Sequence, residues 1–112
     1  MYLSNFQPQC DMGKSLMRTI LNEMLLSGPS IIYGAGIEGI RTLIELKQNG
    51  VVPLCFIDAD ADKHGSIIGG VTIYPLEKLH EYDKETVIIV TPWFSILQIT
   101  KTLEALGFHN IL

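Results

Sequence analysis

The sequence has few basic residues, and they are scattered rather than clustered. Eight Lys and Arg residues stand against twelve Asp and Glu, giving a net charge of −4. A nucleic-acid-binding domain needs a basic stripe to neutralise the phosphate backbone, so this class of protein is excluded. Charged residues make up only 18% of the chain, whereas hydrophobic residues make up 47%. This balance predicts one domain with several fully buried strands.

Long apolar runs and a signal segment are also missing. The longest mostly apolar stretch, residues 87–97, is interrupted by Thr91 and Pro92, and it is far shorter than the roughly 20 residues that a membrane-spanning helix needs. The first residues include Asn, Gln, Pro and Asp, where a signal peptide has a basic and then an apolar segment. We therefore expect a cytoplasmic protein without a membrane partner.

Cysteine is scarce, and the residues that commonly carry chemistry do not form a set. Cys10 and Cys55 have no partner spacing, and a disulfide between them is not expected in a reducing compartment. His64, His80 and His109 lie in separate predicted elements without metal-ligand spacing. The chain has neither a nucleophile elbow nor a phosphate loop with G-K-[ST]. The sequence predicts no metal site and no catalytic residue.

A glycine-rich motif lies between two apolar segments and is the most informative part of the chain. An apolar strand, residues 31–33, runs into G-x-G-x-x-G with glycines at Gly34, Gly36 and Gly39. A helical pattern follows, and the next apolar segment ends at Asp58, about 20 residues after the last glycine. This is the order and spacing of a dinucleotide-binding βαβ unit.

Each part of the motif has a mechanical role. The first glycine permits a sharp turn, the second lets the backbone approach a pyrophosphate, and the third lets the helix press against the sheet. The free N–H groups and the dipole at the start of the helix favour anionic phosphate. Asp58 would accept hydrogen bonds from the ribose hydroxyls, and its charge would repel a 2′-phosphate, so NAD fits better than NADP. The residues of this βαβ unit that are predicted to contact the ligand are Gly34, Ala35, Gly36, Ile37, Glu38, Gly39 and Asp58.

The rest of the chain divides into an N-terminal helical extension, residues 1–29, and a Rossmann-like nucleotide-binding domain, residues 30–112. An apolar stripe predicts a helix from Asp11 to the Gly28-Pro29 stop. This helix either covers the sheet or contacts a second copy or another domain. The expected later elements are a helix from the glycines to 49–50, strands at 51–58, 71–74, 86–91 and 108–112, a small helix at 76–82 and a helix from 95 to 107.

Right-handed crossovers predict a doubly wound, mostly parallel five-stranded sheet with strand order 3-2-1-4-5. In that order, the crevice opens between the ends of the first and fourth strands. Thr91, Pro92 and Trp93 follow the fourth strand and are predicted to flank the second half of a ligand.

Two short patterns resemble known sites and are set aside. Asp58, Asp60 and Asp62 have the spacing that begins a calcium loop, but the later Gly and Glu of that loop are missing. Tyr74 and Lys78 have the spacing of a dehydrogenase Tyr–Lys pair. Pro75, however, places the tyrosine before its helix.

Several segments together resemble a known family. They are Ile32-Tyr33-Gly34-Ala35-Gly36-x-x-Gly39, Phe56-Ile57-Asp58-x-Asp60-x-x-Lys63-x-Gly65, Ile68-Gly69-Gly70-Val71, Val87-Ile88-Ile89-Val90 and Leu106-Gly107-Phe108. The pattern is similar to the Rossmann-like modules of bacterial surface-polysaccharide enzymes. These modules include the N-terminal domain of sugar acyltransferases and the nucleotide-binding domain of sugar-nucleotide dehydratases.

The resemblance implies a binding module that serves a linked sugar-modifying activity and is not catalytic alone. In the acyltransferases the module holds a nucleotide-sugar, and in the dehydratases it is similar to an NAD-binding domain. Ile37 and Glu38 stand where the acyltransferase loop usually has Gly-His, which argues against that subgroup. NAD(H) is the favoured ligand. A nucleotide-sugar remains an alternative, as does a ligand-free module that forms homo-oligomers or binds a larger enzyme through its first helix.

Overall fold

A computed structural model describes residues 28–112. The predicted N-terminal helix falls almost wholly on residues 1–27 and so lies outside the described residues. The described elements are β1 (Ser30–Tyr33), α2 (Ile37–Gln48), β2 (Phe56–Ile57), η1 (Ala61–Lys63), β3 (Ile67–Ile68), β4 (Val71–Tyr74), η2 (Leu76–Glu81), β5 (Val87–Val90), η3 (Trp93–Ser95) and α3 (Ile96–Ala105).

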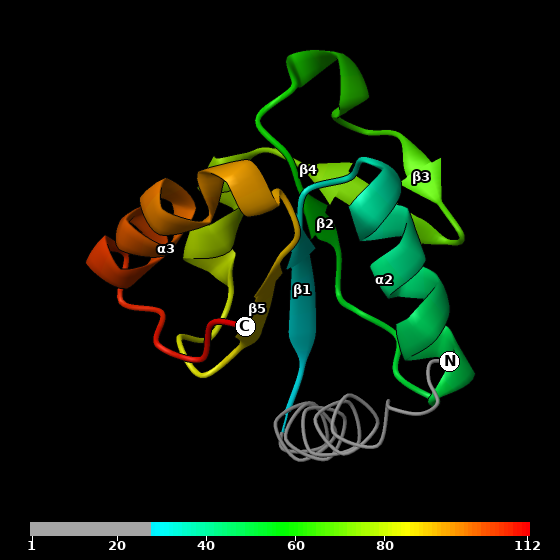
Figure 1. Cartoon of the computed structure of the whole chain (residues 1–112), viewed down its shortest axis with the longest axis horizontal. Helices are drawn as coiled ribbons and strands as arrows, with labels where there is room; N and C mark the ends of the chain where they lie inside the picture. Colours follow the sequence, from blue (N-terminus) through cyan, green and yellow to red (C-terminus); the bar gives the residue numbers. More distant parts are fainter. Residues whose placement is uncertain (1–27) are drawn as a thin grey trace, which may run out of the picture.

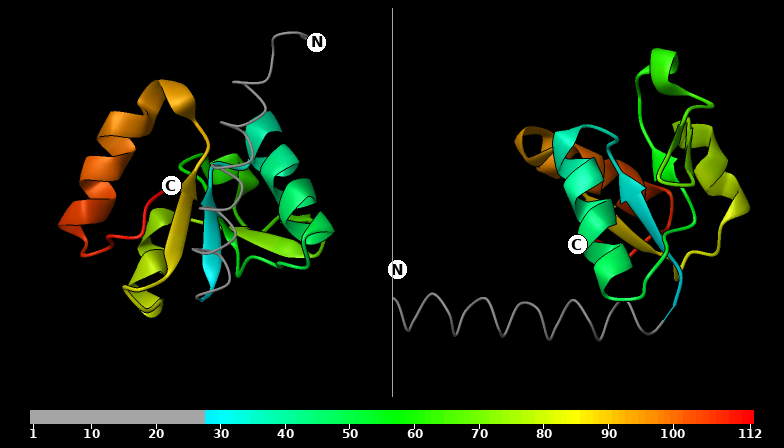
Figure 2. Two further views of the ribbon diagram at one scale, coloured as in Figure 1. Left: turned by 60° about the horizontal axis from the view of Figure 1, so that its bottom comes forward. Right: turned by 90° about the vertical axis from the view of Figure 1, so that its right-hand side faces the viewer.

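The fold is α/β, with a mostly parallel five-stranded sheet between helices. Strand order is β3-β4-β2-β1-β5, and only the pairing of β3 with β4 is antiparallel. Helix α2 lies on one face of the sheet and α3 on the other (Figures 1 and 2). Because β1, β2 and β5 run parallel, the chain segments that follow them all leave the sheet at its carboxyl end.

Alternating side chains of the strands build two cores, one on each face. Ile32, Phe56 and Ile73 pack with Leu43 and Leu46 of α2. The neighbouring strand residues point the other way, to a second core that includes Leu103 of α3. That core consists of Ile31, Cys55, Ile57, Leu79, Ile88, Val90, Leu103 and Phe108. This alternation in β1 and β2 determines which face of the sheet each strand residue points to.

The predicted order 3-2-1-4-5 differs from the observed one at both edges of the sheet. Ile67–Ile68 forms an additional antiparallel strand, because Gly69 and Gly70 both have positive φ (57° and 83°) and close a tight hairpin. At the other edge, residues 108–112 contribute only an isolated parallel bridge between Ile88 and Ile111. The predicted last strand is therefore wrong as a full member of the sheet.

The second predicted strand, residues 51–58, is also too long. Only Phe56–Ile57 pairs as a strand, and the preceding segment has exposed Val52 and Leu54. Pro53 lies within that segment and has no N–H to donate to a ladder. The predicted helix after the glycines is confirmed as α2 and ends before Asn49 and Gly50.

Candidate functional site

The bend between β1 and α2 is packed so closely at two positions that only glycine fits there. Gly34 has φ of +107°, and a Cβ there would lie 2.5 Å from Thr91 Oγ1 and 2.9 Å from the Pro92 ring. A Cβ on Gly39 would overlap the carbonyl oxygen of Gly34 and lie 2.9 Å from its carbonyl carbon. These two glycines are therefore required by the packing of the fold, whatever the site binds.

Gly36 differs from the other two glycines. A Cβ there would meet nothing within 4 Å, and the residue is the N-cap of α2 without any side-chain cap. The amides of the first helical turn therefore lack a capping side chain, as an anion-binding helix start requires. The backbone at Gly36 therefore adjoins open space.

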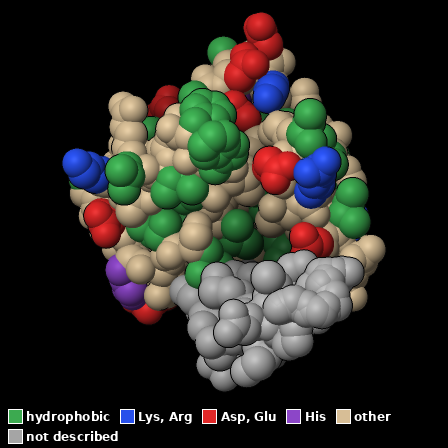
Figure 3. Space-filling view, viewed as in Figure 1, with side chains coloured by type: hydrophobic (Ala, Val, Ile, Leu, Met, Phe, Trp, Pro, Cys, Tyr) green, Lys and Arg blue, Asp and Glu red, His purple; other side chains and the backbone are tan. Residues whose placement is uncertain are grey.

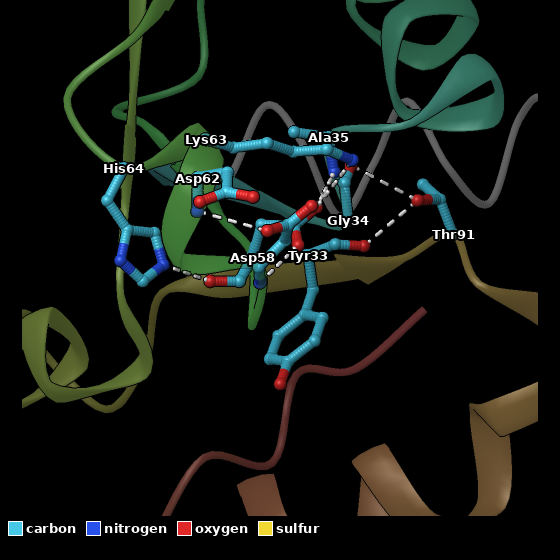
Figure 4. Close-up of polar contacts among 9 residues, drawn as sticks. Tyr33, Gly34, Ala35, Asp58, Asp62, Lys63, His64 and Thr91 are labelled. Atoms are coloured by element: carbon cyan, nitrogen blue, oxygen red, sulfur yellow. Dashed lines mark hydrogen bonds and ion pairs between the residues drawn. The ribbon is translucent and has the colours of Figure 1, made fainter.

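Asp58 turns its carboxylate toward this bend (Figure 4). Its Oδ2 accepts a hydrogen bond of 2.8 Å from the Ala35 amide, and its Oδ1 accepts one of 2.9 Å from the Asp60 amide. The Lys63 ammonium lies 3.6 Å from Oδ2. His64 Nε2 lies 2.7 Å from the Asp58 carbonyl oxygen and ties the following loop to the end of β2. The acid is thus fixed beside the glycine bend by contacts on both sides.

Burial and the surrounding polar groups shift the pKa of Asp58 in opposite directions. Burial alone would raise the pKa of this carboxyl, but the Asp60 and Ala35 amides and the Lys63 ammonium hold its pKa below the ordinary value. Burial, together with the Asp58 charge, raises the pKa of the Tyr33 phenol. At neutral pH the site therefore contains a carboxylate, which accepts hydrogen bonds, and a neutral phenol.

Thr91, Pro92 and Trp93 follow β5 and adjoin the bend. The Thr91 hydroxyl lies 2.9 Å from the Tyr33 carbonyl oxygen and 3.3 Å from that of Gly34, and it can donate to either (Figure 4). Thr91 therefore fixes the loop and has no free donor for a ligand. Pro92 packs on Gly34, whereas Trp93 is 75% exposed.

An exposed apolar cluster marks the start of α3. Trp93 and Phe94 meet edge to face, with ring centroids 6.2 Å apart, and Leu97 is exposed beside them in sequence. Hydrophobic side chains gather near the centre of the face seen in Figure 3, between charged groups on either side. A lone Trp after a buried strand is usually packed in the core, whereas Trp93 lies on the surface.

A cavity of about 270 Å³ opens between the ends of β1 and β2 and the start of α3. It is lined by Tyr33, Gly34, Asp58, Ala59, Pro92, Ser95, Gln98 and Ile99. Small-molecule pockets usually have about 300–1,000 Å³. The cavity therefore lies just below the usual size range of a small-molecule pocket.

The predicted residues do not all lie on the cavity. Gly34, Asp58 and Pro92 line it. Ala35 does not line it, but its amide donates a hydrogen bond to the Asp58 carboxylate, which does. Ile37 is 72% exposed, and Glu38 pairs with Arg41 at 2.9 Å on the outside of the helix.

Residues on or beside the cavity that were not predicted as contacts include Tyr33, Gln98, Ile99 and Lys63. Tyr33 could have been found from its position as the last strand residue before the glycines. Gln98 and Ile99 have no comparable sequence signal, because their distance from the cavity depends on how α3 packs against the sheet.

The two patterns set aside from the sequence have structural roles. Asp58 accepts from the Asp60 amide, and Asp60 in turn accepts from the Asp62 amide at 3.0 Å and caps η1. The aspartates thus shape the loop after β2 by successive turns. Tyr74 precedes its helix as expected, yet Lys78 Nζ still comes within 4.4 Å of the Tyr74 ring centre while pairing with Glu81.

Two general findings accompany this geometry. No helix among residues 28–112 is long and apolar enough to cross a membrane. Within the same residues, no three His, Cys, Asp or Glu side chains are grouped closely enough to hold a metal ion.

Comparison with known proteins gives a matching family and related solved structures. Residues 29–110 match the model of the family described as C2185-like, N-terminal. A crystal structure of UDP-D-quinovosamine 4-dehydrogenase from Vibrio fischeri is similar, with a TM-score of 0.63 and 30% sequence identity. The match covers 74% of this chain and 74% of that chain. Comparison with curated proteins found no significant match.

Proposed function

This chain belongs to the C2185-like N-terminal family, and we propose that it is a Rossmann-like nucleotide-binding module, with NAD(H) as its ligand, serving a sugar-nucleotide enzyme. The observation that carries the proposal is the Asp58 carboxylate beside the Ala35 amide, at the mouth of a cavity of about 270 Å³. An acid at this place suits the ribose hydroxyls of a nucleotide.

The residues present fit such a ligand. Gly36 leaves room over the start of α2, the helix has no side-chain cap, and its first turn favours anionic phosphate. Asp58 would accept from the ribose, and Pro92 and Ile99 offer apolar surface to the base. NAD, when bound, would supply hydride transfer. This chain would bind and orient it.

A nucleotide-sugar is the second candidate, favoured by the similarity to the Vibrio fischeri UDP-D-quinovosamine 4-dehydrogenase. It would use the same bend and the same acid, because UDP also carries a diphosphate and a ribose. The two candidates differ in the base and in the group beyond the diphosphate.

Thermal unfolding with NAD, NADP, UDP-glucose and S-adenosylmethionine distinguishes these candidates. A ligand at 100 times its dissociation constant stabilises the folded state by about 2.7 kcal/mol. We expect stabilisation by NAD that exceeds the effect of NADP, since the Asp58 charge opposes a 2′-phosphate. Stronger stabilisation by UDP-glucose than by NAD would select the second candidate, and no shift with any of the four would reject both.

A pair of matched variants links the binding to the site. Asp58→Asn keeps an acceptor for the Ala35 amide but removes the charge, so we expect weaker NAD binding and reduced discrimination against NADP. Asp62→Asn removes the same charge from an exposed residue of the same loop and should leave binding unchanged. Equal losses in the two variants would mean that only the net charge of the loop matters.

A further inference from the structure

Lys63 reaches across the site from the loop after β2. Its stem runs toward the glycine bend, and its ammonium lies beside Ala35 and 3.6 Å from Asp58 Oδ2 (Figure 4). The backbone of this lysine is fixed, because its amide donates to the Asp60 carbonyl and its carbonyl accepts from the Ser66 amide, both at 3.0 Å. A cation is thereby held at the place where the proposed diphosphate would lie.

The Asp58 carboxylate has hydrogen-bond donors other than this cation. Both of its oxygens already accept hydrogen bonds from backbone amides, at 2.8 and 2.9 Å. The 3.6 Å separation from Lys63 is longer than the roughly 2.7–2.9 Å of a charge-assisted hydrogen bond. The lysine side chain is also 38% exposed, so its ammonium can turn to another anion without losing a short contact.

The acidic side chains around the bend oppose an anionic ligand. Asp58 and Glu38 both place negative charge near the start of α2, and Arg41 is already paired with Glu38 at 2.9 Å. The amides of the first helical turn attract phosphate, but these carboxylates repel it. Lys63 is positioned to offset that repulsion.

We propose that Lys63 binds the diphosphate of the ligand, and so makes the site selective for nucleoside diphosphates over nucleosides. This inference rests on the proposed function. When the diphosphate is bound, the ammonium moves away from Asp58 Oδ2, and the second lone pair of that oxygen, beside the one that accepts from the Ala35 amide, is open to the ribose. Lys63 and Asp58 thus divide the ligand between them, one binding its phosphates and the other its sugar.

Matched ligands test this division of roles. Titration calorimetry of the full chain would compare ADP with adenosine and UDP with uridine, for the wild type and for Lys63→Gln, Lys63→Arg and Lys101→Gln. We expect Lys63→Gln to weaken the binding of the diphosphates by roughly fivefold to tenfold, as for a partly exposed charged hydrogen bond, and to leave the nucleosides unchanged. Lys63→Arg should retain most of the preference. Lys101→Gln, at an exposed position of α3, should retain all of it.

The possible failures are distinguishable. Equal weakening of nucleosides and diphosphates by Lys63→Gln would overturn the inference, because the lysine would then act only through Asp58. Unchanged diphosphate binding in Lys63→Gln would also overturn it, while leaving the proposed function intact. A wild-type chain that binds none of the four ligands would overturn the inference, and thermal unfolding with NAD and UDP-glucose would then decide the proposed function. Circular dichroism of each variant checks that the fold is retained.

Discussion

The three glycines of the motif have separable roles, and alanine substitutions can distinguish them. A Cβ on Gly39 would overlap the Gly34 carbonyl and lie 2.9 Å from its carbon. Both partners are backbone, so no side chain can rotate away, and α2 would have to withdraw by roughly 1 Å. Overpacking of this kind costs about 1–3 kcal/mol or more, and better helix propensity returns less than about 1 kcal/mol.

We therefore expect Gly39→Ala to lower the free energy of unfolding by about 2 kcal/mol. For a domain of this size, that corresponds to a fall in Tm of about 8–16 °C. Urea denaturation followed by circular dichroism would measure the first quantity, and thermal unfolding the second. The comparison is between variants of the full chain, so residues 1–27 are present in each.

Gly36→Ala is the matched control, because it adds the same methyl group to the same glycine motif. The new Cβ would meet nothing within 4 Å, and φ of −91° suits any residue. Stability should change by less than about 0.5 kcal/mol, whereas diphosphate binding should fall because the methyl group occupies the space over the bend. A Gly39→Ala variant as stable as the wild type would refute the reasoning, as would a Gly36→Ala variant that unfolds more readily than Gly39→Ala.

Other perturbations follow from the same geometry. Thr91→Val removes the hydroxyl that bonds to the Tyr33 carbonyl and should cost about 1 kcal/mol in urea denaturation; an unchanged midpoint would mean that the loop is held by packing alone. Trp93→Ala should leave stability within about 0.5 kcal/mol of the wild type, because the side chain is 75% exposed; a larger loss would show that this residue is buried in solution. The folded-state pKa of Asp58 is lowered, so its stabilising effect should be present above the unfolded-state pKa and disappear as pH falls through the folded-state value. Asp58→Asn should accordingly differ most from the wild type near neutral pH, and a difference that persisted at the lowest pH would point to a steric cause.

The sequence predicted the central part of the fold because its local signals agree with one another. An apolar strand, a glycine bend, an amphipathic helix and an acid after the next strand each specify the same βαβ unit. The edges of the sheet were harder to predict. Ile67–Ile68 is only two residues long, and its Gly69-Gly70 turn was the available hairpin signal. Residues 108–112 have an apolar composition typical of a strand but form a single bridge, a distinction that composition cannot make.

The site was predictable from the sequence only in outline. Spacing placed Asp58 at the end of β2 and beside the glycines, but not the hydrogen bond from the Ala35 amide that aims its carboxylate at the bend. Trp93 has a sequence position typical of a core residue, yet α3 packs through Leu103 and leaves the tryptophan outside. Such outcomes depend on the angle at which a helix meets the sheet, which short-range patterns do not specify.

We propose that the cavity serves binding rather than catalysis, on the basis of its titratable groups. A general acid or base works best with a pKa near the operating pH. Asp58 and Tyr33 are the cavity-lining side chains with shifted pKa values among residues 28–112, and both shifts lead away from neutrality: the pKa of the acid is lowered and that of the phenol is raised. Neither group can readily exchange a proton with a substrate at neutral pH. The same shifts suit recognition, because a permanently charged carboxylate accepts from a ribose and a neutral phenol adds no further negative charge beside a diphosphate. The chemistry of the proposed sugar-nucleotide enzyme would then come from groups outside this cavity, with this chain supplying the bound nucleotide.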